Sequence, residues 1–187
     1  MDYTNEITSY FSSLRKTIEA LPISDINEVI NILEDARESG KSVFVMGNGG
    51  SAATSSHFVC DFNKGLSDAS KKRYKFICLN DNIPSLMAYA NDISYEAIFV
   101  EQLKNYFNIG DIVIGISGSG NSKNVLNAIE YANNNAGVTI GITGFNGGQL
   151  KKLAKCNINI PINDMQITED LHLSLDHCIM KILSSYE

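Results

Sequence analysis

The sequence predicts an α/β fold, a three-layer sandwich in which a five-stranded parallel sheet lies between two layers of helices. Short apolar runs rich in β-branched residues alternate with helical patterns, which is the order of a parallel sheet with helical crossovers. These runs lack a strict apolar–polar alternation, as is typical of strands covered on both faces. Loops rich in glycine and serine follow the first and third runs, where sheets of this class bind ligands.

The chain is expected to begin with two helices, at about residues 3–20 and 25–39. Ser24 or Asp25 can cap the second helix, and Gly40 can end it. Five strands are expected at 42–47, 75–80, 111–117, 138–144 and 156–162. Helical patterns cover a stretch reaching to about residue 62, 83–107 with a break near Asn91 and Asp92, 121–134, a short segment after the loop GFNGGQ, and about 166–185. We predict one domain, 1–187, whose leading helices (1–40) pack on the sheet or on a partner subunit.

Composition excludes several classes of protein. The hydrophobic fraction of 44% is ample for a core, so the chain is not disordered. The net charge is −6, and one short basic cluster (Lys71, Lys72, Arg73, Lys75) is expected to be a solvated loop. This balance argues against nucleic acid as the main ligand.

Cysteine usage and the chain start indicate a compartment. The four cysteines contain no CxxC pair, and we expect them to be buried, reduced core residues: Cys60, Cys78, Cys156 and Cys178. The N-terminal segment has no signal-peptide core, and no apolar run approaches the roughly 20 residues that a membrane span needs. We predict a cytoplasmic protein with no membrane partner.

The loop GNGGS, from Gly47 to Ser51, joins a predicted strand to a predicted helix. Its glycines allow a sharp turn and leave backbone N–H groups open to a ligand, and a helix start favours an anion. The loop is neither a Walker loop nor a Rossmann fingerprint. Taken alone, it fits a plain strand-to-helix turn as well as a phosphate site.

The loop SGSGNS repeats this arrangement after the third strand and adds the hydroxyls of Ser117, Ser119 and Ser122. A helix cap explains one serine, but not three serines with two glycines. Two such loops at one sheet edge predict a phosphate site. Because the donors are neutral, a phosphomonoester on a small molecule fits best.

His57 and Asp61 are spaced i, i+4 on the helix after the first loop, so they share a face. An imidazole and a carboxylate on one face can bind a divalent metal or move protons. An isolated pair of this kind is more often a plain surface pair. This one lies two to three turns from the phosphate loop, within reach of a phosphosugar.

The segment TEDLHLSLDHCIM, 168–180, is dense in histidine and carboxylates. At about 100° per residue, Asp170 and His177 differ by about 20°, and Glu169 and His177 by about 80°. His172 and His177 differ by about 140°, so one of the two histidines is expected to be structural. Periodicity alone favours Asp170 with His177, and a charged helix that packs one histidine into the core remains the alternative.

In this order and spacing, GNGGSAATSSHF, GISGSGNSKNVLNAIEYA and TEDLHLSLDHCI resemble the sugar isomerase (SIS) domain, and more narrowly the phosphoheptose isomerase family. The resemblance covers nearly the whole chain. It implies the SIS fold in a homotetramer whose sites lie between subunits. It also implies conversion of sedoheptulose 7-phosphate to D-glycero-D-manno-heptose 7-phosphate through a cis-enediol, as a step towards the heptose of bacterial lipopolysaccharide or capsule. Many members of the family carry zinc.

The resemblance also implies residue roles. Phosphate binding would fall to Asn48, Gly49, Gly50, Ser51, Ser117, Gly118, Ser119 and Ser122. Asp92 matches an aspartate near the family's substrate. The zinc ligands would be His57, Asp61, Glu169 and His177. We expect Asp61 or Glu169 to be the catalytic base and His177 the acid.

Two of these positions depart from the family pattern. Asp61 stands where the family has glutamate, which withdraws the carboxylate by about 1.5 Å; displacements near 1 Å can cost about a hundredfold in rate. Glu169 stands where the family usually has glutamine and adds a negative charge. Either Glu169 compensates for Asp61, or the site has been adapted to a different substrate.

Two other functions remain open at this point. Relatives of the family include non-catalytic regulators of replication initiation, which bind a protein partner and need no complete set of histidines and carboxylates. Retention of that set favours the enzyme. A phosphosugar sensor would usually join a DNA-binding domain, for which the chain has no room.

Overall fold

The structure is a computed structural model that describes residues 1–66 and 72–185. Five strands form one parallel sheet in the order β2-β1-β3-β4-β5. The strands are β1 (Val43–Gly47), β2 (Phe76–Cys78), β3 (Ile112–Ser117), β4 (Val138–Thr143) and β5 (Cys156–Asn159). The predicted five-stranded parallel sheet is therefore confirmed, although β2 and β5 are shorter than expected.

The helices follow the predicted order, with one element that was not expected. They are α1 (Thr4–Glu19), α2 (Ile23–Glu38), α3 (Gly50–Cys60), α4 (Ile83–Asp92), the 3₁₀ turn η2 (Tyr95–Ala97), α5 (Ile98–Tyr106), α6 (Lys123–Asn134), α7 (Leu150–Leu153) and α8 (Met165–Ser185). The unexpected element is a π-helical turn, η1 (Asp61–Gly65), which continues α3. The predicted break after α4 is present at Ile93.

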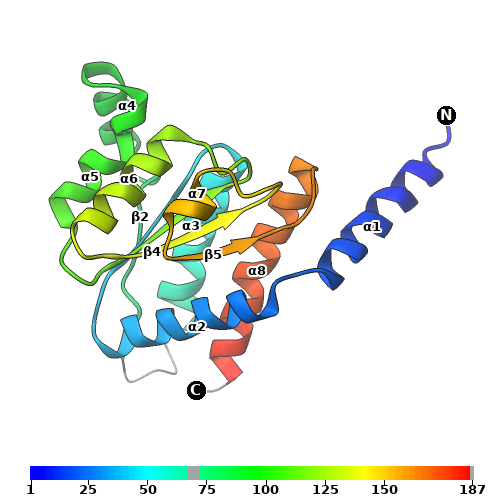
Figure 1. Ribbon diagram of the computed structural model, residues 1–187, viewed down its shortest axis with the longest axis horizontal. Coiled ribbons are helices and arrows are strands. Elements are labelled where there is room, and N and C mark those ends of the chain that lie inside the picture. Colours follow the sequence, from blue (N-terminus) through cyan, green and yellow to red (C-terminus); the bar gives the residue numbers. More distant parts are fainter. Residues whose placement is uncertain (67–71, 186–187) are drawn as a thin grey trace.

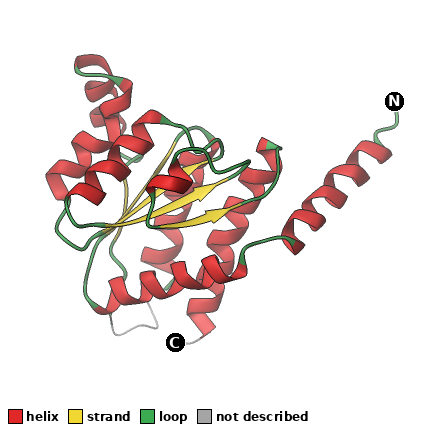
Figure 2. Cartoon of the chain, viewed as in Figure 1, coloured by secondary structure: helices red, strands yellow, loops and turns green. Residues whose placement is uncertain are grey.

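Helices cover both faces of the sheet (Figure 2). An apolar core lies under each helical layer and holds the three layers together. Successive side chains of β1 point to opposite faces, so Val45 joins the core under α2, α3 and α8, and Phe44 joins the core under α5, α6 and α7. Both residues are completely buried. Burial on both faces explains why the strands read as continuous apolar runs.

The strand order places a topological switch point between β1 and β3. From β1 the chain crosses through α3 to β2 on one side, and from β3 it crosses through α6 to β4 on the other side. Because α3 and α6 lie on opposite faces of the sheet, the chain leaves β1 and β3 towards different faces. Sheets of this order bind ligands at the switch point.

Two local expectations need correction, and a third is met. The second helix begins at Ile23, so Ser24 and Asp25 lie inside its first turn and neither is its cap. Gly40 does follow the helix end, with a φ of +66°. Of the four cysteines, which are all free, Cys78 and Cys156 are buried, but Cys60 and Cys178 are exposed because their helix faces point away from the cores.

The basic cluster is only partly described. Lys71 lies outside the described residues, and Lys72 donates its Nζ to the backbone and carboxylate oxygens of Glu38, both at 2.7 Å. Within residues 1–66 and 72–185, no helix combines the length and apolar character needed to cross a bilayer.

Helix α1 extends away from the body of the molecule, whereas α2 lies across it beside α8 (Figure 1). Tyr10 of α1 donates a hydrogen bond to the carboxylate of Asp170 on α8. On the same helix, the apolar side chains of Ile7 and Phe11 are exposed. The two leading helices therefore differ: α2 contributes to the core, and α1 presents apolar residues to the outside.

Candidate active site

The two glycine- and serine-rich loops meet at the switch point. Asn48, in the first loop, and Asn124, in the first turn of α6, exchange two side-chain hydrogen bonds of 2.9 Å each. The hydroxyl of Tyr95 donates to the Asn48 oxygen at 2.8 Å. Asn48 thus links the two loops, and both the nitrogen and the oxygen of its side chain are already hydrogen-bonded within the protein.

The first loop is shaped by its glycines. Gly49 has φ +56° and ψ −124°, a backbone conformation that residues other than glycine rarely adopt. Ser51 follows in the first turn of α3 and is buried, with its carbonyl accepting from the Ser55 hydroxyl at 2.8 Å. The N–H groups at the start of α3 therefore lie next to Gly49, around which no other atom fills the space of a side chain. This arrangement suits the binding of an anion.

The second loop offers hydroxyl donors at the start of α6. Ser117 Oγ and Ser122 Oγ lie 3.0 Å apart, and Ser122 is the residue that precedes the helix. Ser119 is exposed, and its hydroxyl accepts from the backbone N–H of Asn121 at 3.2 Å. Gly118, between them, is packed so closely against Met165 that an added Cβ would lie 2.6 Å from the sulfur. These donors are uncharged, as expected for a small phosphomonoester.

A group of histidines and carboxylates lies further along α3, where α3 runs beside α8. His57 Nε2 and His177 Nε2 are 2.9 Å apart, and Asp61 Oδ2 lies 3.6 Å from the first and 3.8 Å from the second. His57 and Asp61, which are spaced i, i+4, therefore lie directly against His177 of α8. Both imidazole side chains are about half exposed, at 43% and 53%, and Asp61 is 19% exposed.

Asp176 completes this group, although the sequence analysis did not select it. Among the described residues, one ligand atom from each of His57, Asp61, Asp176 and His177 lies within 4.8 Å of every other. The Asp176 carboxylate is fully buried and neither oxygen has a hydrogen-bond partner. Burial, helped by the negative charge of Asp61, raises the pKa of Asp176 to about 8.

Glu169 lies elsewhere in the subunit. It contacts the first turn of α3, where a Cβ added to Gly50 would fall 2.4 Å from its carboxylate oxygen. It is eight residues before His177 on α8, which is about 12 Å along the helix axis. Glu169 therefore lies beside the first loop, next to Gly50. Within one chain it is not part of the group formed by His57, Asp61, Asp176 and His177.

The other polar residues of α8 also face different neighbours. Asp170, which the helical angle paired with His177, instead accepts from Tyr10. The angle alone misleads because seven residues separate the two by about 10 Å along the axis. His172 is 1% exposed, and burial lowers its pKa to about 4. His172 is thus the structural histidine that was expected.

Asp92, expected near the substrate, is the exposed last residue of α4 and accepts from the Asn91 side chain at 2.7 Å. Close to it in the chain, Tyr95 reaches Asn48. A cavity of about 240 Å³ lies between α4 and the first loop and includes Asn48, Gly49 and Tyr95 in its lining. Asp92 is not among the residues that line this cavity.

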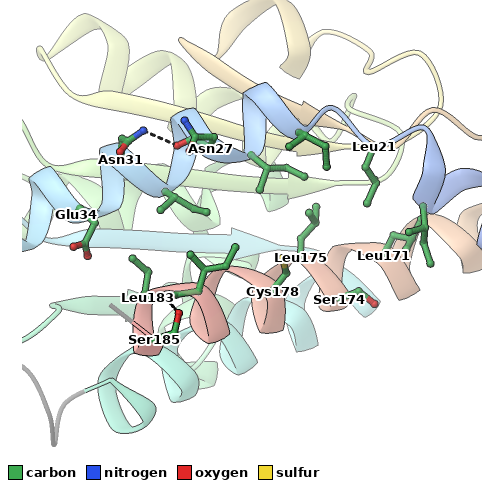
Figure 3. Close-up of a pocket in the computed structure, with 15 residues that line it drawn as sticks. Leu21, Asn27, Asn31, Glu34, Leu171, Ser174, Leu175, Cys178, Leu183 and Ser185 are labelled. Atoms are coloured by element: carbon green, nitrogen blue, oxygen red, sulfur yellow. Dashed lines mark hydrogen bonds between the residues drawn. The ribbon is translucent and has the colours of Figure 1, made fainter. Parts of the chain in front are cut away.

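A larger groove, of about 880 Å³, lies away from these residues, between α2 and α8 (Figure 3). It is lined mainly by apolar side chains, such as Leu21, Leu171 and Leu183, which point between the two helices. Cys178 lines it, although the neighbouring His177 joins the histidine group. Helix α8 therefore separates the polar group from an apolar groove.

A comparison with protein-family models matches residues 2–144 to the family described as SIS domain, which is more than half of the chain. Among curated proteins, the chain is similar to the phosphoheptose isomerase of Aliarcobacter butzleri, at 31% identity over 96% of this chain and 94% of the relative. It is also similar to the probable phosphoheptose isomerase of Thermoplasma acidophilum, at 37% identity over 87% and 89% of the two chains.

Solved structures agree with these relatives. The phosphoheptose isomerase of Francisella tularensis matches with a TM-score of 0.87 and 28% identity, covering 98% of both chains. That of Neisseria gonorrhoeae matches with a TM-score of 0.90 over 98% of this chain and 100% of the other. Its identity is 23%, so this second likeness concerns the fold alone.

Proposed function

The chain belongs to the phosphoheptose isomerase family of SIS-domain proteins, and from this premise we propose that it is an aldose–ketose isomerase acting on a sugar phosphate. The first substrate pair to test is sedoheptulose 7-phosphate and D-glycero-D-manno-heptose 7-phosphate. The observation that carries the proposal is the position of two different chemistries on one helix. Helix α3 begins at the phosphate loop and ends at His57 and Asp61.

The spacing along α3 supports a long, open-chain substrate. His57 is seven residues after Gly50, which corresponds to about 10 Å along the helix axis. The phosphate is held at the loops by Asn48, the N–H groups of Gly49, Gly50 and Gly118, and the hydroxyls of Ser51, Ser117, Ser119 and Ser122. An extended sugar chain then reaches the histidines with its carbonyl end. Asp92 lies at the exposed end of α4, and its role near the substrate rests on the family resemblance alone.

Asp61 is the base in this proposal. A ketose becomes an aldose when the proton on C1 is removed, an enediol forms, and a proton is returned to C2. The carboxylate of Asp61 stands among the histidines, at the end of α3 that the carbonyl reaches, whereas Glu169 contacts the phosphate end. This location favours Asp61 over Glu169 as the group that accepts the C1 proton.

His177 is the acid. Its side chain is 53% exposed, and its Nε2 lies 2.9 Å from the Nε2 of His57, within hydrogen-bond distance. In this proposal the Nε2 of His177 carries the proton. Transfer of that proton to the carbonyl oxygen neutralises the oxyanion that develops as C1 is deprotonated. The Asp61 carboxyl then returns its proton to C2, and the O1–H proton passes back to the Nε2 of His177, which restores both groups.

Zinc is the cofactor that we propose for this site, and the donor set fits it. A tetrahedral zinc with bonds of about 2.0–2.1 Å holds its ligand atoms about 3.4 Å apart. The separations among His57, Asp61 and His177 range from 2.9 to 3.8 Å, which brackets that value. When bound, zinc would act as a Lewis acid on the carbonyl oxygen, and the Nε2 of His177 would then be a ligand and not a proton donor. Glu169 remains a ligand that the family resemblance implies and that one subunit does not bring near.

We also propose a cytoplasmic homotetramer. The free cysteines of the described chain suit a reducing compartment. The exposed apolar residues of α1 and the groove between α2 and α8 suit burial in an oligomer.

The test is isomerase activity on a panel of ketose phosphates for the wild type, Asp61→Ala and His177→Ala. We expect turnover of a seven-carbon ketose phosphate and a loss of at least about a hundredfold in each variant, because general acid–base groups contribute about 10²–10⁴-fold. Ser119→Ala is the matched control at the other end of the site, and it should raise KM more than it lowers kcat. Unchanged turnover in both variants would remove the assignment. Capture of a stoichiometric protein partner without any isomerase activity would favour the regulator.

A further inference from the structure

We infer that Asp176 is a ligand of a divalent metal ion, bound from the interior side of the group formed by His57, Asp61 and His177. The location of the metal site rests on the proposed function. The role of Asp176 is additional to it, because neither the sequence motifs nor the resemblance pointed to this residue. Metal binding can be measured without any assay of the isomerase.

The environment of Asp176 calls for a cation. Its carboxylate is completely buried, and neither oxygen accepts a hydrogen bond. Proteins rarely leave a buried carboxylate in this state, because the charged form loses its hydration and gains nothing in return. One oxygen of Asp176 nevertheless lies within 4.8 Å of a ligand atom on each of the other three side chains. A cation placed among these four ligand atoms would therefore be close to the unpaired carboxylate of Asp176.

The neighbours of Asp176 strengthen this reading. A carboxylate oxygen of Asp61 lies within 4.8 Å of Asp176, and its negative charge opposes a second one close by. The ion-pair partners of Asp61 in the described chain are His57 and His177, which are metal ligands when neutral and not permanent cations. A divalent ion between these groups would satisfy both carboxylates and separate the two imidazole nitrogens.

The direction of approach is set by α8. Residues 176 and 177 are adjacent, so their side chains leave the helix about 100° apart. His177 lies on the exposed side and Asp176 on the buried side. Both can reach one ion only if it sits between these two directions, where α8 contacts the end of α3 and where His57 and Asp61 lie. Two imidazoles with the Asp176 carboxylate suit zinc, and also cobalt, manganese or iron in the divalent state.

This ligand set changes the role of Asp61. With His57, His177 and Asp176 as three protein ligands, the ion keeps one position for substrate, which is the pattern of catalytic zinc sites. Asp61 is the carboxylate with solvent access, so it is the one free to turn towards the sugar. Asp176 thereby supplies a negative ligand for which the family resemblance pointed to Glu169.

The experiment measures Co²⁺ and Zn²⁺ binding by the purified full chain, using the visible absorption of Co²⁺ and competition with a chromophoric chelator. The variants are Asp176→Asn and Asp176→Leu, which keep the approximate side-chain shape. Asp170→Asn is the control, because this aspartate lies on the same helix and bonds to Tyr10 outside the group. We expect both Asp176 variants to bind at least about tenfold more weakly with an altered Co²⁺ spectrum, since loss of even an outer-sphere partner costs about 10–100-fold. Asp170→Asn should bind like the wild type.

A second readout separates a ligand from a structural residue. In the metal-free form, Asp176→Leu should melt at or above the temperature of the wild type, because it removes a buried carboxylate that has no partner. The inference is overturned if the wild type binds neither ion, if Asp176→Leu binds Co²⁺ with unchanged affinity and spectrum, or if it loses the metal only because its metal-free form melts lower. If metal binding depends on Asp176 but no sugar phosphate is turned over, the inference stands and the proposed function fails. If the sugar phosphate is turned over and metal binding does not depend on Asp176, the proposed function stands and the inference fails.

Discussion

At the scale of single residues, the two histidines of α8 have opposite environments although only five residues separate them. His172 points into the core and is 1% exposed, with no hydrogen-bond partner on either ring nitrogen. His177 is about half exposed and contacts His57 and Asp61. Burial lowers the pKa of the first to about 4, so its ring is neutral in the folded protein near neutral pH. The side chain of the second is accessible to protons, metal and substrate.

His172 should make the protein sensitive to acid. Its pKa is lowered by burial from 6.5 to about 4 in the fold, so the unfolded chain takes up a proton first as the pH falls. The neutral ring costs nothing above pH 6.5, and stability is lost between pH 6.5 and 4, by about 3 kcal/mol in total. Urea unfolding of the wild type and His172→Leu at pH 7, 5.5 and 4 measures this. The stability difference between the two should shift by about 3 kcal/mol in favour of the variant as the pH falls; a difference that is constant with pH would contradict the prediction.

Glu169 is the second residue whose position is informative. Its carboxylate contacts the start of α3, where the proposed phosphate binds, so it repels the substrate there. We expect Glu169→Gln to lower KM by roughly fivefold, from about 1 kcal/mol of relieved repulsion near the surface, and to leave kcat within about twofold.

The control for Glu169 is Asp170→Asn, which removes the neighbouring charge that bonds to Tyr10. It should change neither kinetic constant. A fall in kcat of about a hundredfold in Glu169→Gln, with KM unchanged, would instead make Glu169 the base and contradict the assignment of Asp61.

At the scale of elements, the site depends on how β1 turns into α3. The backbone of Gly47, the last residue of β1, is held on both sides by Asn80, which accepts from its N–H at 3.1 Å and donates to its oxygen at 2.8 Å. A Cβ on Gly47 would lie 2.6 Å from Ser51 Cβ and 2.7 Å from the Ser51 backbone. Neither residue can move away to relieve this contact. The Gly47 backbone is held by its hydrogen bonds to Asn80, and Ser51 belongs to the first turn of α3.

Gly47→Ala should therefore destabilise the fold by about 1–3 kcal/mol, as overpacking against backbone does. The matched control is Gly65→Ala at the end of η1, where the nearest atom to an added Cβ is the Met180 sulfur at 3.9 Å. That variant should stay within about 0.5 kcal/mol of the wild type. Chemical denaturation of the three proteins provides the comparison, and equal losses in both variants would show that the close approach at Gly47 is not decisive.

At the scale of the whole molecule, two apolar features have no partner within the described chain. Helix α1 exposes Ile7 and Phe11, and it extends from the body towards solvent (Figure 1). The groove between α2 and α8 is lined mainly by apolar side chains (Figure 3). Surfaces of this kind are typical of subunit interfaces, and the proposed homotetramer would cover them.

Phe11→Asp and Ile182→Asp place a charge on α1 and in the groove, respectively. If both surfaces are buried between subunits, each variant should lower the molar mass measured by light scattering after size exclusion from that of a tetramer towards a dimer or monomer. Ile109→Asp is the control, because Ile109 is apolar and 73% exposed but lies in the loop before β3. A monomeric wild type, or tetramers in all three variants, would contradict the assembly.

The fold and both loops could be predicted because their signals lie between neighbours in the chain. Apolar runs, helical periods and glycines next to serines act within a few residues, and the carboxyl ends of parallel strands meet at one edge in any sheet of this class. The i, i+4 pair of His57 and Asp61 was accessible for the same reason. The cap of α2 was not, because Pro22 occupies the cap position and no side chain caps this helix.

The composition of the histidine group required the tertiary structure. An angle around α8 places Asp170 near His177, but it says nothing about distance along the axis or about which helix packs beside it. The parallel alignment of α3 and α8 sets Gly50 against Glu169 and His57 against His177, and it leaves Asp176 buried between them. The sequence by itself thus determined the sheet, the phosphate loops and the chemical character of the site. Only the packing of two helices far apart in the chain decided which carboxylates share it, because that register depends on long-range contacts.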